Sequence, residues 1–472
     1  MTIMAFGQSL DGRPLFDRRS AAGAAAALAQ ALGGEIEPLR MLSRAVDETG
    51  FHPVEQRRQA YDRNDPVAAG WTYLVNASDP RCEAWKEVIA PLAAYRGMLA
   101  PLAPLAYRGE GPSAWVRWLT NEYFGRGIGR HRPPGFVLIL GGPDQVPFEF
   151  QSMLQTVASV GRLDFCELEA FHVYVAKLLR LAGAAEPTVD REAVMFGPDG
   201  GDRDPTHYSR RDMVEPLAEH LRGRHSFHVT RLLGDQATKP ALVSALASRR
   251  PALVYVAGHG IAAVDAPVEE QRASNGAICC ARQSRHFFDD VFSAQDVDLR
   301  EPLLEGAVVF QFGCHGYGTP ATSAYSHWLE RKSQLVPGPE FVAALPRRLL
   351  EHPRGPIAYL GHVDLAFLHA FTAGAPLEPG AQWHARMAPF VRAVDHLVTL
   401  DPAGRAMEDM NARYGGFNAM IAAMYDDIQR QHHALSRMQS DLLVENWIMR
   451  GDAKNYMLLG DPAVGLRLPA VG

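Results

Sequence analysis

The chain has 472 residues, a length that accommodates two or three domains. Hydrophobic residues make up 47% of it and charged residues 21%, values that exclude an intrinsically disordered protein. The net charge is −6 with both signs interspersed, so the sequence has neither the basic stripe of a nucleic-acid-binding protein nor an acidic tail for a basic partner.

The cysteines and the first residues indicate the cellular compartment in which the protein is expected. Five cysteines are an odd number, and their spacing gives no disulfide framework, which favours a reducing compartment. The first residues lack the basic and then apolar pattern of a secretory signal. The most apolar later window, residues 88–106, is interrupted by Arg96 and three prolines and is not a clean membrane span. We therefore expect a cytoplasmic protein that does not bind a membrane.

Residues 1–130 are expected to be helical and irregular and to form an accessory region. The alanine-rich segment 21–32 predicts a helix that ends at Gly33 and Gly34, because glycine commonly follows the last helical residue. The region carries no chemical motif. An activating protein partner, if the protein has one, is expected to bind here.

Residues 131–187 are predicted to form a small α/β subdomain. The apolar run 136–140 predicts a buried strand that runs into a turn at Gly141 and Gly142, and residues 168–181 predict a helix. The glycine pair lacks the Gly-Lys-Ser/Thr of a phosphate-binding loop and the full dinucleotide fingerprint. We interpret it as a strand-to-helix turn and expect no cofactor.

Residues 188–468 alternate strands with helices, as in a doubly wound parallel sheet with right-handed crossovers. Strands are expected at 193–196, 227–232 and 356–361 and in the runs that begin at 251 and 306, and helices at 208–221, 239–248, 341–350 and 407–448. The predicted fold class is α/β. A mostly parallel sheet flanked by helices follows the smaller α/β subdomain and the helical N-terminal region.

Two of the predicted strands end in reactive side chains. Pro-Ala-Leu-Val-Tyr-Val-Ala-Gly precedes His259, and Gly-Ala-Val-Val-Phe-Gln-Phe-Gly precedes Cys314. Such continuous apolar runs are typical of strands buried on both faces of a parallel sheet, and chemistry in these sheets occurs beyond the carboxyl ends of the strands. A thiol and an imidazole at one edge form a nucleophile and its base. We therefore predict a catalytic dyad of His259 and Cys314.

The glycines around these residues fit a second requirement. An attacked carbonyl needs backbone N–H groups within about 3 Å, and a Cβ atom would obstruct the approach. The candidate oxyanion donors are the amides of Gly260 and Cys314. Either reactive residue alone would more often be structural, as a buried thiol or a hydrogen-bonded core histidine. Their joint placement before glycine favours catalysis.

A metal site is not expected. Cys279 and Cys280 are adjacent and lack the spacing of a zinc knuckle, and the chain has no Cys-x-x-Cys pair. His315 follows the proposed nucleophile directly, so its side chain should point to the opposite side and be structural.

The two motifs resemble the His-Gly and Cys-Gly signatures of caspase-like cysteine peptidases, a group that includes caspases, metacaspases, gingipains, separases and CHAT-domain peptidases. The resemblance to gingipains covers about residues 136–468. It is carried by Ala257–Gly260, Phe312–Gly316, Leu140–Pro147, Val160–Leu163 and Leu458–Ala463. It implies a metal-free His/Cys dyad that cleaves peptide bonds. Two departures limit it: gingipains are exported, and Phe312 stands where caspases have glutamine, so a preference for aspartate cannot be transferred.

Cleavage specificity in this group depends on a charge in the pocket for the residue before the scissile bond. Asp202 and Asp204, in the loop after the first strand of the catalytic region, and Asp364, just after a later strand, are the candidates. They favour cleavage after arginine or lysine, although arginines in the same loop leave the sign open. For each aspartate the alternative is a solvated loop residue or a helix cap.

The resemblance thus implies a cytoplasmic cysteine endopeptidase that cuts a protein or peptide substrate in a regulated bacterial defence or cell-death pathway. Maturation by self-cleavage is expected in the loop after Cys314, near Arg331 and Lys332. Two alternatives stay open. One is a catalytically silent caspase-like binding or adaptor module, and the other is a thiol acyl transferase or ligase that uses the same dyad.

Overall fold

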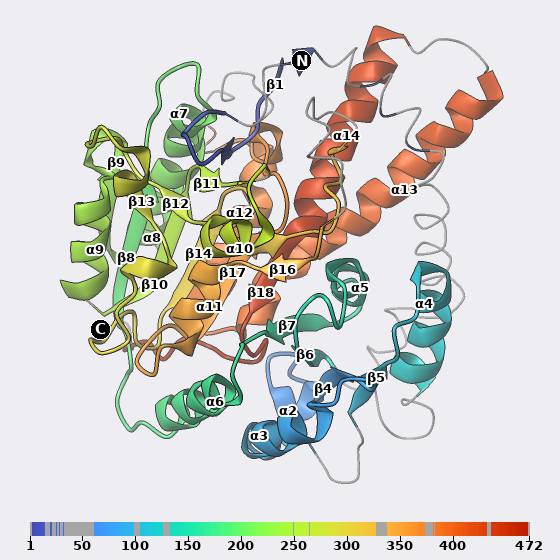
Figure 1. Ribbon diagram of the computed structural model, residues 1–472, viewed down its shortest axis with the longest axis vertical. Coiled ribbons are helices and arrows are strands. Elements are labelled where there is room, and N and C mark those ends of the chain that lie inside the picture. Colours follow the sequence, from blue (N-terminus) through green and yellow to red (C-terminus); the bar gives the residue numbers. More distant parts are fainter. Residues whose placement is uncertain are drawn as a thin grey trace.

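A ten-stranded mixed β-sheet organises the computed structural model (Figure 1). The structure describes residues 2–14, 19–20, 25, 28, 32, 61–98, 104–125, 133–248, 250–263, 265–326, 338–372, 381, 383–431 and 436–470. Helices flank this sheet, which confirms the predicted α/β class with a large, mostly parallel sheet. Among the described residues, no helix has the length and apolar character needed to cross a bilayer.

The sheet consists of two parallel halves that run in opposite directions. Along the sheet the strands follow the order β5, β4, β6, β7, β18, β17, β14, β10, β8, β9, and only the pair β17–β18 is antiparallel. The strands are β4 (Trp71–Asn76), β5 (Leu105–Tyr107), β6 (Phe136–Leu140), β7 (Ser159–Leu163), β8 (Asp190–Gly197), β9 (His228–Leu233), β10 (Pro251–Ala257), β14 (Val308–Phe312), β17 (Ala358–His362) and β18 (Tyr456–Leu459).

Thirteen α-helices lie in the part of the chain that the structure describes. They are α2 (Pro66–Ala69), α3 (Cys82–Tyr95), α4 (Pro112–Trp118), α5 (Phe148–Leu154), α6 (Leu168–Ala182), α7 (Pro205–Ser209), α8 (Glu215–His225), α9 (Lys239–Ser248), α10 (Val268–Ser274), α11 (Ala344–Glu351), α12 (Ala388–Val398), α13 (Glu408–Gln431) and α14 (Arg437–Asn455). In Figure 1, α13 and α14 form a long pair at the upper right. The helix expected at 341–350 begins later, because Phe341–Val342 forms strand β16 against β15 (Gly318–Thr319).

The N-terminal region contains more β-structure than the sequence analysis expected for residues 1–130. Strands β4 and β5 extend the main sheet beyond β6, so this part of the chain is not merely helical and irregular. The β4 sequence, Trp-Thr-Tyr-Leu-Val-Asn, is rich in aromatic and β-branched residues, which pack well on a pleated surface. Within the predicted helix 21–32, the described residues Ala25, Leu28 and Leu32 are helical and buried.

A small second sheet lies beside the predicted catalytic residues. Its strand order is β13 (Val291–Phe292), β12 (Ile278–Cys279), β11 (Gly260–Ile261) and β2 (Gly7–Gln8). Strand β11 begins directly after His259, and β2 pairs with it in parallel. The first residues of the chain therefore lie next to the carboxyl end of β10.

The buried carboxylate of Asp461, just after β18, contacts one side chain at the start of β4 and another at the end of α3. Asp461 is fully buried and accepts hydrogen bonds from Trp71 Nε1 at 2.9 Å and Arg96 Nε at 2.8 Å. Its backbone N–H donates to the hydroxyl of Tyr174 at 2.8 Å. Because the guanidinium of Arg96 is only 12% exposed, removal of Asp461 would leave a largely desolvated charge without its partner.

We therefore expect Asp461→Ala to lower the free energy of unfolding by about 3–5 kcal/mol, seen as a lower urea midpoint. The matched control is Glu83→Ala, which removes the exposed pair with Lys86 and should cost less than about 1 kcal/mol. Equal midpoints for the two variants would show that the Asp461 contacts do not stabilise the fold.

Candidate active site

The two predicted catalytic residues follow neighbouring parallel strands at equivalent positions. Ala257 at the end of β10 is in register with Phe312 at the end of β14, and the Gly258 N–H donates to the Phe312 carbonyl at 3.1 Å. His259 and Cys314 each lie two residues beyond these paired positions, at the same edge of the sheet. The apolar runs are fully buried, and Tyr255 stacks on Phe310 across the two strands.

His259 is held by the carboxylate of Asp204. Its Nε2 lies 3.0 Å from both carboxylate oxygens, and the imidazole is almost completely buried. Asp204 is also the N-cap of α7, where it accepts hydrogen bonds from the Thr206 N–H at 2.9 Å and the Thr206 hydroxyl at 2.5 Å. Burial opposes ionisation of Asp204, but the hydrogen bonds and the charge of His259 outweigh it and lower its pKa to about 2.

The second imidazole nitrogen of His259 is available for proton transfer. His259 Nδ1 is buried and has no hydrogen-bond partner among the described residues. Asp204 thus orients the ring through Nε2 and leaves Nδ1 without a hydrogen bond within the described part of the chain. This division of the two nitrogens is the arrangement that a general base requires.

The thiol of Cys314 is fully buried in this structure. Its Sγ accepts a hydrogen bond from the Ala366 N–H at 3.2 Å and lies 3.8 Å from the Ala366 carbonyl oxygen. Burial raises the pKa of the Cys314 thiol well above its usual range, more than the hydrogen bond from Ala366 lowers it. The neutral thiol is thus the favoured form while the site is closed.

The two amides predicted as oxyanion donors point at one oxygen atom. The N–H groups of Cys314 and Gly260 donate to the carbonyl oxygen of Phe6, at 3.1 Å and 3.5 Å. Donors of an oxyanion site lie about 2.7–3.1 Å from the oxygen, a range that the Cys314 amide meets and the Gly260 amide exceeds. Here that oxygen belongs to the chain's own N-terminal segment.

Gly260 is required for the close approach of these two segments. A Cβ atom at this position would lie 2.1 Å from the carbonyl oxygen of Cys314, a distance that no side chain tolerates. We expect Gly260→Ala to separate the ends of β10 and β14, to lower the melting temperature and to reduce peptide hydrolysis by at least about a hundredfold. In the control Gly223→Ala, on helix α8, the added Cβ meets no atom within 4 Å. If both variants melt and hydrolyse alike, the close approach has no functional consequence.

The three candidate specificity aspartates occupy different environments. The Asp202 side chain is 94% exposed and lies 3.8 Å from His207 Nε2. The Asp204 carboxylate contacts His259, as described. Asp364 is buried, accepts hydrogen bonds from the Ser323 hydroxyl and from the N–H groups of Ala324 and Leu365, and has its pKa raised by burial to about 6. The structure does not bring these carboxylates together.

Asp364 instead supports the loop that carries the thiol. The His315 N–H donates to the Asp364 carbonyl at 2.9 Å, and both residues have positive φ angles, of 56° and 81°. His315 is buried with Nδ1 3.3 Å from the Thr319 hydroxyl, and burial lowers its pKa to about 4. This neutral, hydrogen-bonded histidine is in keeping with the structural role expected for it.

Sequence reasoning missed Phe6, and it named Asp204 for the specificity pocket and not as the partner of His259. Phe6 was part of a region without a chemical motif, although the apolar run Ile3–Phe6 before Gly7 has the pattern of a short buried strand. The contact between Asp204 and His259 joins residues far apart in the sequence, and no local signal predicts it.

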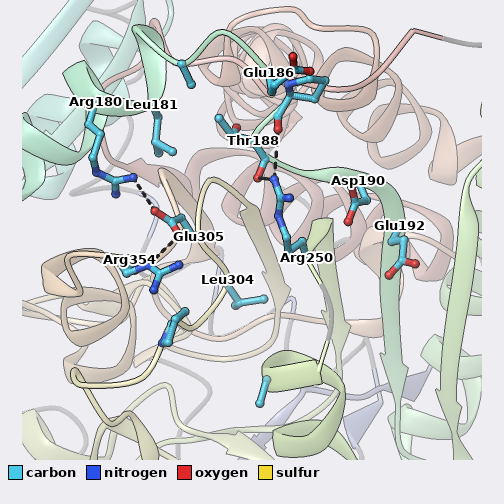
Figure 2. A pocket seen from close by; sticks show the side chains of 14 residues that line it. Arg180, Leu181, Glu186, Thr188, Asp190, Glu192, Arg250, Leu304, Glu305 and Arg354 are labelled. Atoms are coloured by element: carbon cyan, nitrogen blue, oxygen red, sulfur yellow. Dashed lines mark hydrogen bonds and ion pairs between the residues drawn. The ribbon is translucent and has the colours of Figure 1, made fainter.

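Two other clusters lie apart from this site. A hollow at the amino ends of β8, β10 and β14 is lined by seven charged residues, three of which pair with one another (Figure 2). Glu305 pairs with Arg180 and Arg354, and Arg250 donates to the carbonyl of Thr188. None of its lining residues is a cysteine, serine or histidine. It therefore offers neither a thiol nor an imidazole for a dyad of the kind predicted from the sequence.

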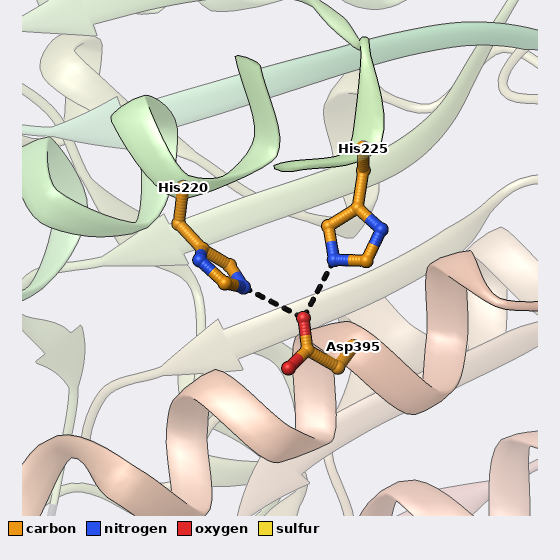
Figure 3. A group of neighbouring side chains, drawn as sticks. All are labelled: His220, His225 and Asp395. Atoms are coloured by element: carbon orange, nitrogen blue, oxygen red, sulfur yellow. Dashed lines mark hydrogen bonds and ion pairs between the residues drawn. The ribbon is translucent and has the colours of Figure 1, made fainter. Parts of the chain in front are cut away.

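The second cluster joins α8 to α12 through His220, His225 and Asp395 (Figure 3). Each imidazole Nε2 lies 2.6 Å from the same Asp395 oxygen. Ligands of a tetrahedral zinc ion at 2.0–2.1 Å would be about 3.3 Å apart. The spacing is therefore that of direct hydrogen bonds, which connect the two helices.

Neither a protein-family model nor a curated protein sequence matches the chain. Solved structures do resemble it. One, described as the structure of a protease, has a TM-score of 0.50 at 12% sequence identity and covers 88% of this chain and 82% of its own. At this identity the likeness concerns the fold, and it agrees with the mostly parallel α/β sheet.

Two further structures have lower scores. The complex of Porphyromonas gingivalis RgpB pro- and mature domains has a TM-score of 0.43 at 12% identity and covers 84% of this chain and 80% of its own. The Arg-specific cysteine proteinase gingipain R also has a TM-score of 0.43, at 10% identity, and covers 86% and 79%.

Proposed function

We propose that the chain is a cysteine endopeptidase with Cys314 as nucleophile and His259 as general base and acid. One observation carries the proposal. Both residues lie two positions beyond register partners on adjacent parallel strands, and the amides of Gly260 and Cys314 donate to a single carbonyl oxygen at the same edge. A nucleophile, a base and an oxyanion site at one edge are the minimum for acyl transfer.

The reaction would proceed by two acyl transfers. Cys314 Sγ attacks the scissile carbonyl while its proton passes to His259 Nδ1, and the amides of Gly260 and Cys314 stabilise the oxyanion. Collapse of the tetrahedral intermediate breaks the C–N bond, and His259 protonates the departing amine. A water molecule, deprotonated by His259, then attacks the thioester and releases the carboxylic acid and the free thiol. No step calls for a metal or an organic cofactor.

The finer features of the function stay predictions. A cytoplasmic location, a defence or cell-death pathway and an activating partner rest on the sequence alone. Cleavage after a basic residue rests on Asp202, Asp204 and Asp364, whose carboxylates have the separate environments described above. The expected self-cleavage near Arg331 and Lys332 lies outside the described residues.

Digestion of an unbiased peptide library tests the proposal. We expect wild-type chain to produce fragments that the Cys314→Ala variant does not, and the masses of the two products of each cut should add up to the intact peptide plus one water. Joined products would indicate a ligase. The Phe6→Asp variant, which disrupts the segment at the oxyanion donors, is assayed as well. If neither wild type nor this variant digests the library, the chain is a binding module.

A further inference from the structure

The first residues of the chain cross the proposed active site as an extended strand. The Phe6 N–H donates to the Ala366 carbonyl at 2.9 Å, and the Leu368 N–H donates to the Met4 carbonyl at 3.0 Å. Ala5 is the antiparallel bridge partner of Phe367. Beyond Phe6 the pairing changes to the other side of the site, where β2 pairs in parallel with β11. We call residues 3–8 the cleft strand.

This pairing places one peptide group where a substrate would react. Strand addition to an exposed edge is a general way for peptides to bind, with main-chain hydrogen bonds on either side of the recognised residue. Here the residue flanked by both pairings is Phe6, and its carbonyl oxygen accepts from the amides of Cys314 and Gly260. Phe6 thus occupies the position of the residue whose carbonyl the thiol attacks.

The side chain of Phe6 identifies the pocket for that residue. It is fully buried, and its ring meets the ring of Phe312 edge-on at a centroid distance of 4.9 Å. The rings of His259 and Phe371 lie at 6.0 Å and 6.1 Å from it. Phe312 and Phe371 also contact each other at 5.5 Å. The pocket wall around this side chain is therefore aromatic.

We propose, building on the peptidase function, that the cleft strand is an intramolecular substrate mimic. The pocket formed by Phe312 and Phe371 then selects a large apolar residue before the scissile bond, in place of the basic residue that the sequence analysis favoured. An arginine or lysine in this pocket would bury its charge against aromatic rings, whereas a phenylalanine or leucine gains the burial of its whole side chain. The cleft strand also covers the thiol, so the full chain is self-inhibited until the strand is displaced.

The inhibition has a direct chemical cause. Cys314 is fully buried in the presence of the cleft strand. This burial disfavours its thiolate, which is the nucleophilic form. The oxyanion donors are occupied by Phe6 in addition. Displacement of the cleft strand would free both amides and give solvent and substrate access to the sulfur.

The test uses the full chain with Phe6→Asp, which places a charge in the aromatic pocket, and Phe6→Ala as a milder second variant. The control is Arg13→Ala, which removes a side chain that is 77% exposed and lies beyond the cleft strand. Two rates are measured: alkylation of Cys314 by iodoacetamide, read from the mass of the Cys314 peptide, and hydrolysis of reporters that differ only in phenylalanine, leucine, arginine or aspartate before the scissile bond. Circular dichroism confirms that each variant is folded.

We expect both Phe6 variants to raise the alkylation rate and kcat/KM by roughly tenfold to a hundredfold, the range corresponding to burial of one large apolar side chain, and Arg13→Ala to leave both rates unchanged. Phenylalanine and leucine reporters should exceed the arginine reporter by a similar factor. A peptide aldehyde with the sequence Ile-Met-Ala-Phe, copied from residues 3–6, should inhibit Phe6→Asp more strongly than its arginine counterpart.

The outcomes separate the two proposals. Unchanged alkylation in both folded Phe6 variants, or preference for the arginine reporter and aldehyde, would overturn the mimic while leaving the peptidase intact. Faster alkylation without hydrolysis of any reporter would confirm that the strand covers Cys314 but overturn its role as a substrate mimic, together with the peptidase function itself.

Discussion

Replacing Cys314 by alanine should abolish peptide hydrolysis, lowering kcat/KM by at least about 10⁴-fold, since removal of a catalytic nucleophile has an effect of this order or larger. The reason is chemical: alanine cannot form the thioester on which both acyl transfers depend. The measurement is kcat/KM on a phenylalanine reporter, both in the natural chain and in the Phe6→Asp background. The second background is needed because the cleft strand, which covers Cys314 in the natural chain, could mask the loss of hydrolysis.

Cys280→Ala is the matched control for that loss. Cys280 is also a buried thiol, but it lies on the chain segment after β12, where its Sγ donates to the Ile278 carbonyl at 3.8 Å. Its removal should change kcat/KM by less than about twofold. Full activity of Cys314→Ala, or an equal loss in both variants, would remove Cys314 from the proposed mechanism.

The main part of the fold could be predicted because its signals are local. Apolar runs bounded by glycine mark β10 and β14, and the alternation with helices such as α9 indicates parallel pairing. Register then follows from the sheet itself: Ala257 pairs with Phe312, so residues two positions later meet at one edge. The α9 bounds, Lys239–Ser248, are those expected from sequence.

Long-range pairings explain what the sequence analysis missed. Strand β18 comes from the end of the chain yet lies between β7 and β17, where it joins the two sheet halves. Strands β4 and β5 enter the same sheet from a region expected to be helical and irregular. Short strands carry too few residues for a periodic signal, and their partners are set by tertiary packing.

The candidate site likewise combines residues that have a local sequence signal with residues that have none. His259 and Cys314 were identifiable from the residues that precede them. The partner of His259 was not, because the loop that contains Asp204 also contains arginines and further aspartates, and hydrogen bonding to a residue 55 positions away leaves no local trace. The occupant of the oxyanion site was hidden for another reason: an apolar strand at a chain start has no chemical signature of its own.

Asp204→Asn should lower kcat by about 10²- to 10⁴-fold with little change in KM, because an amide in place of the carboxylate can hold the wrong tautomer of the imidazole. Asparagine is as good an N-cap as aspartate, so the start of α7 should be preserved and the loss isolates the charge. The measurement is the separate determination of kcat and KM on the phenylalanine reporter in the Phe6→Asp background. Asp202→Asn, in the same loop but 94% exposed, is the control and should leave both constants unchanged.

The pH dependence of stability gives this positioning role a second readout. The folded-state pKa of Asp204 is about 2, below its ordinary value of 3.8, so its interactions stabilise the fold above pH 3.8 and this stabilisation is lost as the pH falls towards 2. Asp204→Asn lacks that titration, and its melting temperature should fall less steeply than that of wild type over this window. If the melting temperature of Asp204→Asn falls with pH as steeply as that of wild type, and its kcat is that of wild type, Asp204 neither holds His259 nor serves the reaction.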